Sequence, residues 1–184
     1  ACRCAVAALK DAGAEVEEIA LPDFPLLEMF KTLWYAGAAA RLAAIAPDRR
    51  ALCDPEFLEI VREGAARSAE DYCTAAAMRA EFGRQMDALF SAHDVIASPA
   101  TPIAAFAAGS QVPVGSGYER WTDWAGFSFP LNLSQQPACV VPYGMISDNR
   151  PVALQFAASR GRDATVLSAA AAFEAGIARN EIGK

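Results

Sequence analysis

The side chains that could act as a nucleophile or a general base are few in this sequence. The single histidine, His93, follows a predicted helix and directly precedes a predicted strand. A histidine in the last turn of a helix is favoured by the helix dipole and bonds free carbonyl groups, so we interpret it as structural. A thiol enzyme that pairs it with Cys73 or Cys139 is an alternative. The spacing does not support that pairing, and Cys139 lies in an apolar strand where a thiol is unreactive.

A serine nucleophile activated by lysine needs a desolvated lysine that stays neutral. Lys184 is the last residue, Lys10 lies on the polar side of a predicted helix, and Lys31 flanks an apolar stripe as a snorkelling surface residue. The nearest candidate for an oxyanion or phosphate loop is Gly115-Ser116-Gly117, but no strand-turn-helix pattern surrounds it. The residue types therefore predict no catalytic set within this chain.

The cysteines do not form a metal-binding pattern. Cys2-Arg3-Cys4 has no second pair and no nearby histidine, so we expect no metal and no cofactor. An odd number of cysteines at irregular spacing is typical of reduced thiols and indicates a cytoplasmic protein. The five are Cys2, Cys4, Cys53, Cys73 and Cys139.

Composition predicts a single globular domain over residues 1–184. The chain is 54% hydrophobic and 21% charged with a net charge of −6, and it has no Lys/Arg run, which excludes the electrostatic pattern of a nucleic-acid-binding protein. No apolar stretch approaches the length of a membrane span, so we expect no membrane partner. The sequence opens at Ala1 inside a helical pattern, which we interpret as a cut, natural or by design.

Helices alternate with short strands along the chain, which is typical of an α/β domain. Asp54-Pro55 is a helix start with an N-cap and proline at the first position, and Ser68 with Asp71 resembles a capping box. The predicted helices cover residues 1–12, 25–46, 54–67, 68–90 and 164–179, the last capped by Asp163. The predicted strands are 14–21, 94–98, 129–134, 138–141 and 152–156, with loops at 47–50 and 99–120.

An aromatic cluster follows the long loop at 99–120. Its members are Tyr118, Trp121, Trp124, Phe127 and Phe129. One interpretation is core packing of the loop onto the sheet. The other is the apolar wall of a ligand pocket, because pockets are mostly apolar and loops carry function more than strands do.

Four motifs in the second half of the chain carry a family resemblance. They are D-V-I-A-S-P-A-T-P at 94–102, F-P-L-N-L-S at 129–134, P-A-C-V-V-P-Y-G at 137–144 and R-P-V-A-L-Q-F at 150–156. Their order and gaps resemble the C-terminal half of amidase-signature hydrolases, and residues 9–22 and 69–90 resemble elements that precede them in that family. Two departures are Gln135 and Ala153, which stand where the family usually has glycine.

This resemblance implies a partial amidase-signature fold, with a mixed β-sheet flanked by helices. It implies a parent enzyme that hydrolyses a carbon–nitrogen amide bond with a serine nucleophile in a Ser-Ser-Lys triad, without metal or cofactor. The triad and the glycine- and serine-rich signature loop precede the region seen here, so we expect this chain to lack the catalytic N-terminal half and to be inactive alone. It would wall the substrate funnel with Trp121, Trp124, Phe127, Phe129, Asn132 and Pro102 of the 99–102 loop.

Two points about that wall stay open in the sequence. Asn132 has a structural alternative, since an asparagine in a turn often bonds its own backbone. In the glutamine-using component of tRNA-dependent amidotransferases, an acid falls at the position of Ala125, and Asp123 is two residues away. The sequence therefore favours an amidase for a small or apolar amide.

The alternative to an amidase portion is a free-standing α/β module that binds a ligand or a partner. If the chain is instead an incomplete domain, it exposes apolar surface that its missing half covers, and large exposed apolar patches drive association. We therefore expect a homo-dimer or aggregation in solution.

Overall fold

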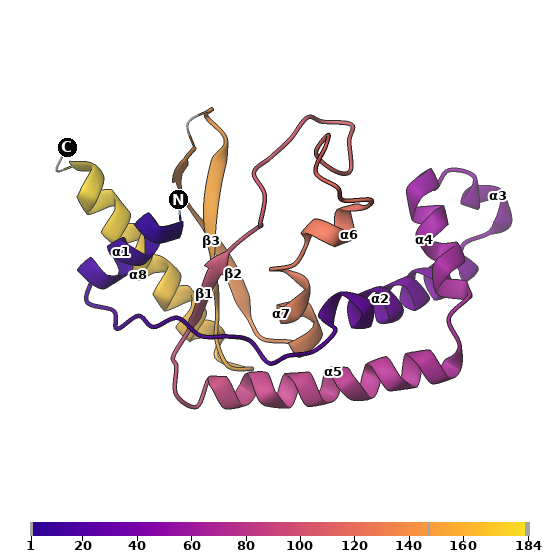
Figure 1. Cartoon of the computed structure of the whole chain (residues 1–184), viewed down its shortest axis with the longest axis horizontal. Helices are drawn as coiled ribbons and strands as arrows, with labels where there is room; N and C mark the ends of the chain where they lie inside the picture. Colours follow the sequence, from indigo (N-terminus) through magenta and orange to yellow (C-terminus); the bar gives the residue numbers. More distant parts are fainter. Residues whose placement is uncertain (1, 147, 183–184) are drawn as a thin grey trace.

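The computed structural model describes residues 2–146 and 148–182, so Lys184 lies outside the described residues. Figure 1 shows the sheet and α8 on one side, α2 to α4 on the other, and α5 running along both. The elements are α1 (Cys2–Asp11), α2 (Leu26–Ala43), α3 (Pro47–Arg50), α4 (Pro55–Ala65), α5 (Ala69–Leu89), β1 (Ile96–Pro99), α6 (Trp121–Trp124), α7 (Phe129–Ser134), β2 (Ala138–Met145), β3 (Pro151–Ala157) and α8 (Asp163–Ile182).

The sheet has three strands in the order β1-β3-β2, and it confirms the α/β class. Both described strand pairings are antiparallel, whereas the sequence predicted a mixed sheet. Gln155 on β3 pairs with Ser98 of β1 on one side and with Val140 of β2 on the other. The backbone N–H of Ile146 bonds the carbonyl of Arg150, so β2 and β3 form a tight hairpin. A hairpin can join only antiparallel neighbours, which explains this part of the difference.

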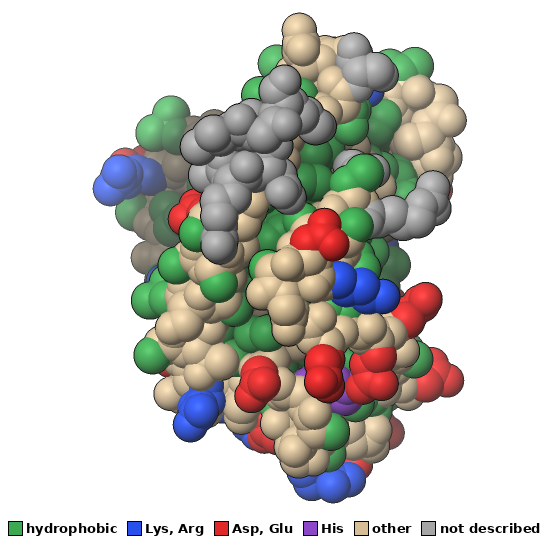
Figure 2. All heavy atoms as spheres, turned by 90° about the vertical axis from the view of Figure 1, so that its left-hand side faces the viewer, with side chains coloured by type: hydrophobic (Ala, Val, Ile, Leu, Met, Phe, Trp, Pro, Cys, Tyr) green, Lys and Arg blue, Asp and Glu red, His purple; other side chains and the backbone are tan. Residues whose placement is uncertain are grey.

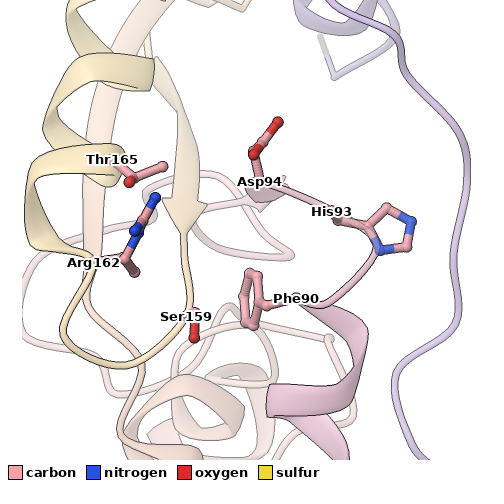
Figure 3. Close-up of a pocket in the computed structure, with 6 residues that line it drawn as sticks. All are labelled: Phe90, His93, Asp94, Ser159, Arg162 and Thr165. Carbon is pink, nitrogen blue, oxygen red and sulfur yellow. The ribbon is translucent and has the colours of Figure 1, made fainter.

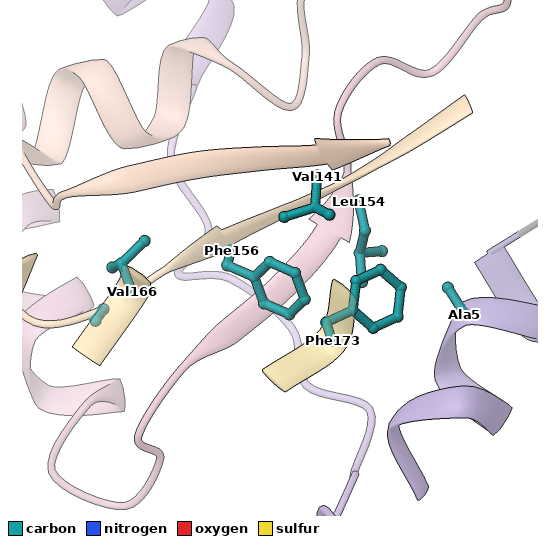
Figure 4. Close-up of a cluster of buried hydrophobic side chains, with 7 residues drawn as sticks. Ala5, Val141, Leu154, Phe156, Val166 and Phe173 are labelled. Atoms are coloured by element: carbon teal, nitrogen blue, oxygen red, sulfur yellow. The ribbon is translucent and has the colours of Figure 1, made fainter. Parts of the chain in front are cut away.

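One face of the sheet carries a buried apolar core. Alternate residues of β2 and β3 point to this face and meet α8, with α1 alongside (Figure 4). The rings of Phe156 and Phe173 lie 5.4 Å apart at 65°, an edge-to-face contact. The buried members of this core are Ala5, Val141, Leu154, Phe156, Ala158, Val166 and Phe173.

A second core joins the helical part to the segment that carries the aromatic cluster. It lies where α2, α5 and α7 pack together, and α6 contributes Trp121 at its border. Its buried members are Met29, Phe30, Phe82, Met86, Ala125, Phe129 and Leu133.

Two of the three predicted helix caps are confirmed, whereas Asp163 is the first residue of α8. The Asp54 side chain accepts hydrogen bonds from the N–H groups of Glu56 and Phe57 at 2.9 and 3.1 Å. Ser68 and Asp71 form a reciprocal capping box, and these bonds lower the pKa of the Asp71 carboxyl. These signals are local, so they need no knowledge of the rest of the fold.

Three local predictions were wrong. Residues 14–21 form an irregular segment instead of a strand. Val16 and Ile19 are half-buried, but no described strand pairs with this segment. Residues 47–50 form the short helix α3 instead of a loop. Residues 129–134 form helix α7 instead of a strand, since Pro130 is accommodated in the first helical turn and Gln135 ends the helix with φ of 66°.

Candidate functional site

The structure brings two of the predicted wall residues together over α2. Trp121 begins α6 and Phe129 begins α7, and both meet Phe30. The rings of Phe30 and Phe129 stack at 5.2 Å and 22°, whereas Trp121 meets Phe30 edge-on at 6.2 Å and 80°. Phe129 is buried, but Trp121 keeps part of its surface open. Trp121 is therefore the member of this pair that a ligand could touch.

Trp124 and Phe127 connect the wall to other segments. The indole N–H of Trp124 donates to the carbonyl oxygen of Gln111 at 2.8 Å, and its ring meets Phe106 edge-on at 5.8 Å. Both partners belong to the long loop after β1, so Trp124 fixes that loop against α6. The carbonyl oxygen of Phe127 accepts a hydrogen bond from the side chain of Gln155 on β3.

Asn132 and Pro102 lie apart from these ring contacts. The Asn132 side chain is exposed and donates to the carbonyl oxygen of Ser128 at 2.9 Å, one helical turn earlier. The structural alternative expected a bond in a turn, whereas this bond lies along helix α7. Pro102 is exposed on the loop after β1. Their assignment to the substrate wall stays a prediction.

An ion pair at the edge of the aromatic cluster was missed. Lys31 was predicted to extend to the surface, but its Nζ lies 2.9 Å from Oδ1 of Asp123, and both side chains are mostly buried. Oδ2 of Asp123 accepts from the backbone N–H groups of Glu119 and Arg120, each at 3.0 Å. Asp123 therefore holds the start of α6 and ties it to α2. Its position at the third residue of W-T-D-W is the sequence signal that could have indicated this capping.

The electrostatics of Asp123 follow from these contacts. Burial alone raises the pKa of its carboxyl, but Lys31 and the two backbone donors outweigh that effect and lower the pKa below its ordinary value. The carboxylate is thus charged and already paired at neutral pH. It presents no free negative charge to a ligand.

A buried hydrogen bond and a further ion pair hold α6 in place. The hydroxyls of Tyr35 and Thr122 lie 3.2 Å apart, and both side chains are completely buried. The guanidinium of Arg120 lies 2.6 Å from Oε1 of Glu63 on α4. Helix α6 is therefore fastened to both α2 and α4, which gives Trp121 a rigid support.

In the described part of the chain, the hydrogen-bond partners of His93 are Leu89 and Glu17 and not a cysteine. His93 donates from Nδ1 to the carbonyl oxygen of Leu89 at 2.7 Å, which confirms its structural interpretation, and its Nε2 lies 2.5 Å from Glu17. Burial, and secondarily the charge of Glu174, raises the pKa of the Cys139 thiol, which opposes thiolate formation. Among residues 2–146 and 148–182, no group of three or more His, Cys, Asp or Glu side chains is placed to hold a metal.

A hollow of about 240 Å³ lies beside the C-terminal end of α5 (Figure 3). Asp94 and Arg162 lie on opposite sides of the gap, and the His93 ring points away from it toward the segment before α2. None of the predicted wall residues lines this hollow, so it is separate from the aromatic cluster. Its lining consists of Phe90, His93, Asp94, Ser159, Arg162 and Thr165.

Comparison with known proteins decides the family. The amidase family profile matches residues 1–167. The chain belongs to the amidase family. An acylamidase of Rhodococcus erythropolis is 34% identical over 181 residues, which cover 95% of this chain and 38% of that protein. One component of the glutamyl-tRNA(Gln) amidotransferase of Bacillus thuringiensis is 32% identical over 105 residues, covering 56% of this chain and 21% of that component.

Solved amidase structures share the fold of this chain. One amidase crystal structure superposes with a TM-score of 0.82 at 24% identity, and covers 95% of this chain and 41% of its own. The 6-aminohexanoate cyclic dimer hydrolase, in complex with its substrate, gives a TM-score of 0.78 at 22% identity, with 95% and 40% covered. These matches confirm a partial amidase-signature fold, and this amidase-family chain spans roughly two fifths of such proteins. The described residues include no helix long and apolar enough to cross a membrane.

Proposed function

We propose that this chain is the C-terminal part of an amidase, in which it forms the scaffold and the wall of the substrate funnel. The enzyme would hydrolyse a carbon–nitrogen amide bond with a serine nucleophile that lies outside this chain. The family match over nearly the whole chain, combined with 38% coverage of the acylamidase, is the observation that carries the proposal. The whole of residues 1–184 then acts as one α/β unit of the larger enzyme.

The aromatic cluster supports a role in substrate contact. Trp121, Trp124, Phe127 and Phe129 lie on α6, on α7 and in the turn between them, and an apolar wall of this kind excludes water from a reacting amide. Asn132 and Pro102 would border it. The ion pair at the edge of this wall, Lys31 with Asp123, is balanced, so the wall favours a neutral, small or apolar amide.

The exposed apolar side chains of the sheet suggest where the rest of the enzyme would pack. Val140 and Met145 on β2 are 51% and 66% exposed, on the strand that ends the sheet order. We propose that the remaining part of the amidase covers this surface, and that the isolated chain forms a homo-dimer through it. The free cysteines, Cys4, Cys53, Cys73 and Cys139, support a cytoplasmic location.

The test compares this chain alone with the same chain preceded by its natural upstream sequence. We expect amide hydrolysis only by the longer protein, and its inactivation by a fluorophosphonate that labels a serine upstream of residue 1. Hydrolysis by residues 1–184 alone, or a label located on them by mass spectrometry, would contradict the proposal. Size-exclusion chromatography tests the dimer separately, because a particle of 19.5 kDa would exclude it.

A further inference from the structure

A third tryptophan joins the aromatic wall from a segment that the sequence did not connect with it. Trp34 lies on α2, and its ring meets Trp121 edge-on at 5.5 Å and 82°. The two residues are far apart in sequence but form one continuous aromatic surface. Trp34 has three ring neighbours and is still 39% exposed.

One face of the Trp34 indole is occupied and space remains beside it. Phe30, one helical turn earlier, stacks against Trp34 at 6.0 Å and 21°. The next turn of α2 carries Gly37, and a side chain placed there would meet no atom within 4 Å. Residues three positions apart are neighbours on a helix, so the missing side chain leaves an open position next to the indole.

The surroundings of this open position are rigid and electrically balanced. Phe30 stacks on Trp34 and also on Phe129, and the hydrogen bond between Tyr35 and Thr122 fixes α2 against α6. Lys31, one turn before Trp34, is paired with Asp123. The rings of Trp34 and Trp121 meet at 82° and form an apolar corner, in which a planar aromatic group can stack on one ring and meet the other edge-on. The paired charges of Lys31 and Asp123 offer no counter-charge to an ammonium or carboxylate.

We infer that Trp34 is a specificity-determining residue that, with Trp121, receives a planar aromatic group of a neutral amide substrate. This inference deepens the proposed function and rests on it. Lys31 acts as a positioning residue, because its bond to Asp123 keeps α6, and with it Trp121, in register with Trp34. The enzyme then selects N-aryl or aryl-acyl amides over small aliphatic ones.

The test uses the protein with its natural upstream sequence and two neutral substrates, acetanilide and acetamide. Trp34→Ala is expected to raise KM for acetanilide about threefold to tenfold, the loss of one aromatic contact, while kcat for both amides and KM for acetamide stay within about twofold. Trp34→Phe is expected to retain most of the acetanilide affinity. Gly37→Leu, which fills the open position, is expected to raise KM for acetanilide without removing any contact.

A matched control separates a local effect from a general one. Tyr72→Ala removes an exposed aromatic side chain of α5, 46% exposed, and is expected to leave both KM values unchanged. Equal effects of Trp34→Ala on the two amides, or full acetanilide affinity in both Trp34→Ala and Gly37→Leu, would overturn the inference. The latter result would mean that another part of the enzyme covers Trp34.

A binding measurement keeps the inference testable apart from catalysis. In the protein with its natural upstream sequence, Trp→Phe variants of Trp34, Trp121 and Trp124 assign the indole N–H NMR signals of these three residues. Acetanilide is expected to shift the signals of Trp34 and Trp121 but not that of Trp124, whose N–H is bonded to Gln111. Hydrolysis of neither amide by the unmodified protein would refute the proposed function, whereas an unmoved Trp34 signal would refute the aromatic site.

Discussion

The side-chain amide of Gln155 donates to the carbonyl oxygen of Phe127 at 2.9 Å and to Oγ of Ser98 at 3.1 Å. Gln155 lies on the central strand β3 and is 7% exposed. Its two bonds therefore hold the turn between α6 and α7 against β1 and β3. The sheet thus fixes the position of the aromatic wall through one buried side chain.

Replacing Gln155 is expected to loosen that attachment. Gln155→Leu leaves the Phe127 carbonyl without its donor and costs about 1–3 kcal/mol of folding free energy, measured by urea unfolding. Ser98→Ala is the matched control, because it keeps the bond to Phe127. It removes the Gln155 bond to Ser98 and the bond of the Ser98 hydroxyl to the Pro99 carbonyl, and is expected to cost about 1 kcal/mol. Equal stability of the two variants would show that the bond to Phe127 adds nothing measurable to the free energy of unfolding.

The close approach of α2 and α4 at Gly64 gives a second prediction. A Cβ at Gly64 would overlap the backbone carbonyl of Tyr35, and a backbone cannot yield as a flexible side chain does. Gly64→Ala is therefore expected to destabilise the protein by about 1–3 kcal/mol or more. The melting temperature should fall accordingly.

Gly37 is the matched control for Gly64. It also lies inside a helix, α2, but a Cβ there meets nothing within 4 Å. Gly37→Ala is expected to stabilise by about 0.5–1 kcal/mol through helix propensity alone. If both alanine variants changed stability in the same direction, the helix contact at Gly64 would not be as close as described.

Local signals explain which parts of this fold could be predicted. Asp54-Pro55 and the Ser68–Asp71 pair fix helix starts through bonds within four residues, so the sequence alone was sufficient. The strand prediction for residues 129–134 was wrong because the periodicity of a short apolar run fits a strand and a helix equally well. Packing against α2 and α5 decides for the helix, and that information lies far away in the chain.

The residues of the candidate site also differ in whether the sequence alone could predict them. The aromatic cluster at residues 118–129 could be predicted because its members are close in sequence. Trp34 and Lys31 were not visible as members, since their partners Trp121 and Asp123 lie on a different element. Contacts between distant elements follow from the tertiary fold and leave no periodic signal in a single sequence.

The departure from the family at Gln135 gives a third prediction. Gln135 ends α7 with φ of 66°, a left-handed conformation that glycine adopts without steric cost. Gln135→Gly is expected to stabilise by about 0.5–1 kcal/mol, because relief of about 1–2 kcal/mol of strain exceeds the added chain entropy. Gln135→Ala keeps the strain, and should show no gain in a urea titration; equal stability of the glycine and alanine variants would count against this explanation.

The contact of His93 with Leu89 and Glu17 predicts a dependence of stability on pH. Acidic side chains gather on the face of the molecule shown in Figure 2, and Asp94 is the next residue in the chain. The Leu89 carbonyl first, and then Glu17, raise the pKa of His93 above its ordinary value of 6.5. The protonated ring is thus favoured in the folded state, so its contribution is complete below pH 6.5 and is lost as pH rises through the folded-state pKa.

Melting temperatures across this range, compared with those of two variants, measure the contribution. His93→Gln is expected to remove this part of the pH dependence, so its melting temperature falls short of the unmodified protein's below pH 6.5 and approaches it at higher pH. Glu17→Gln keeps the Leu89 bond and should lower the His93 pKa only part of the way, followed by NMR titration of the ring. A His93 pKa at or below 6.5 in the unmodified protein would show that the ring is not held in its charged form, and that the segment before α2 rests on α5 without this ion pair.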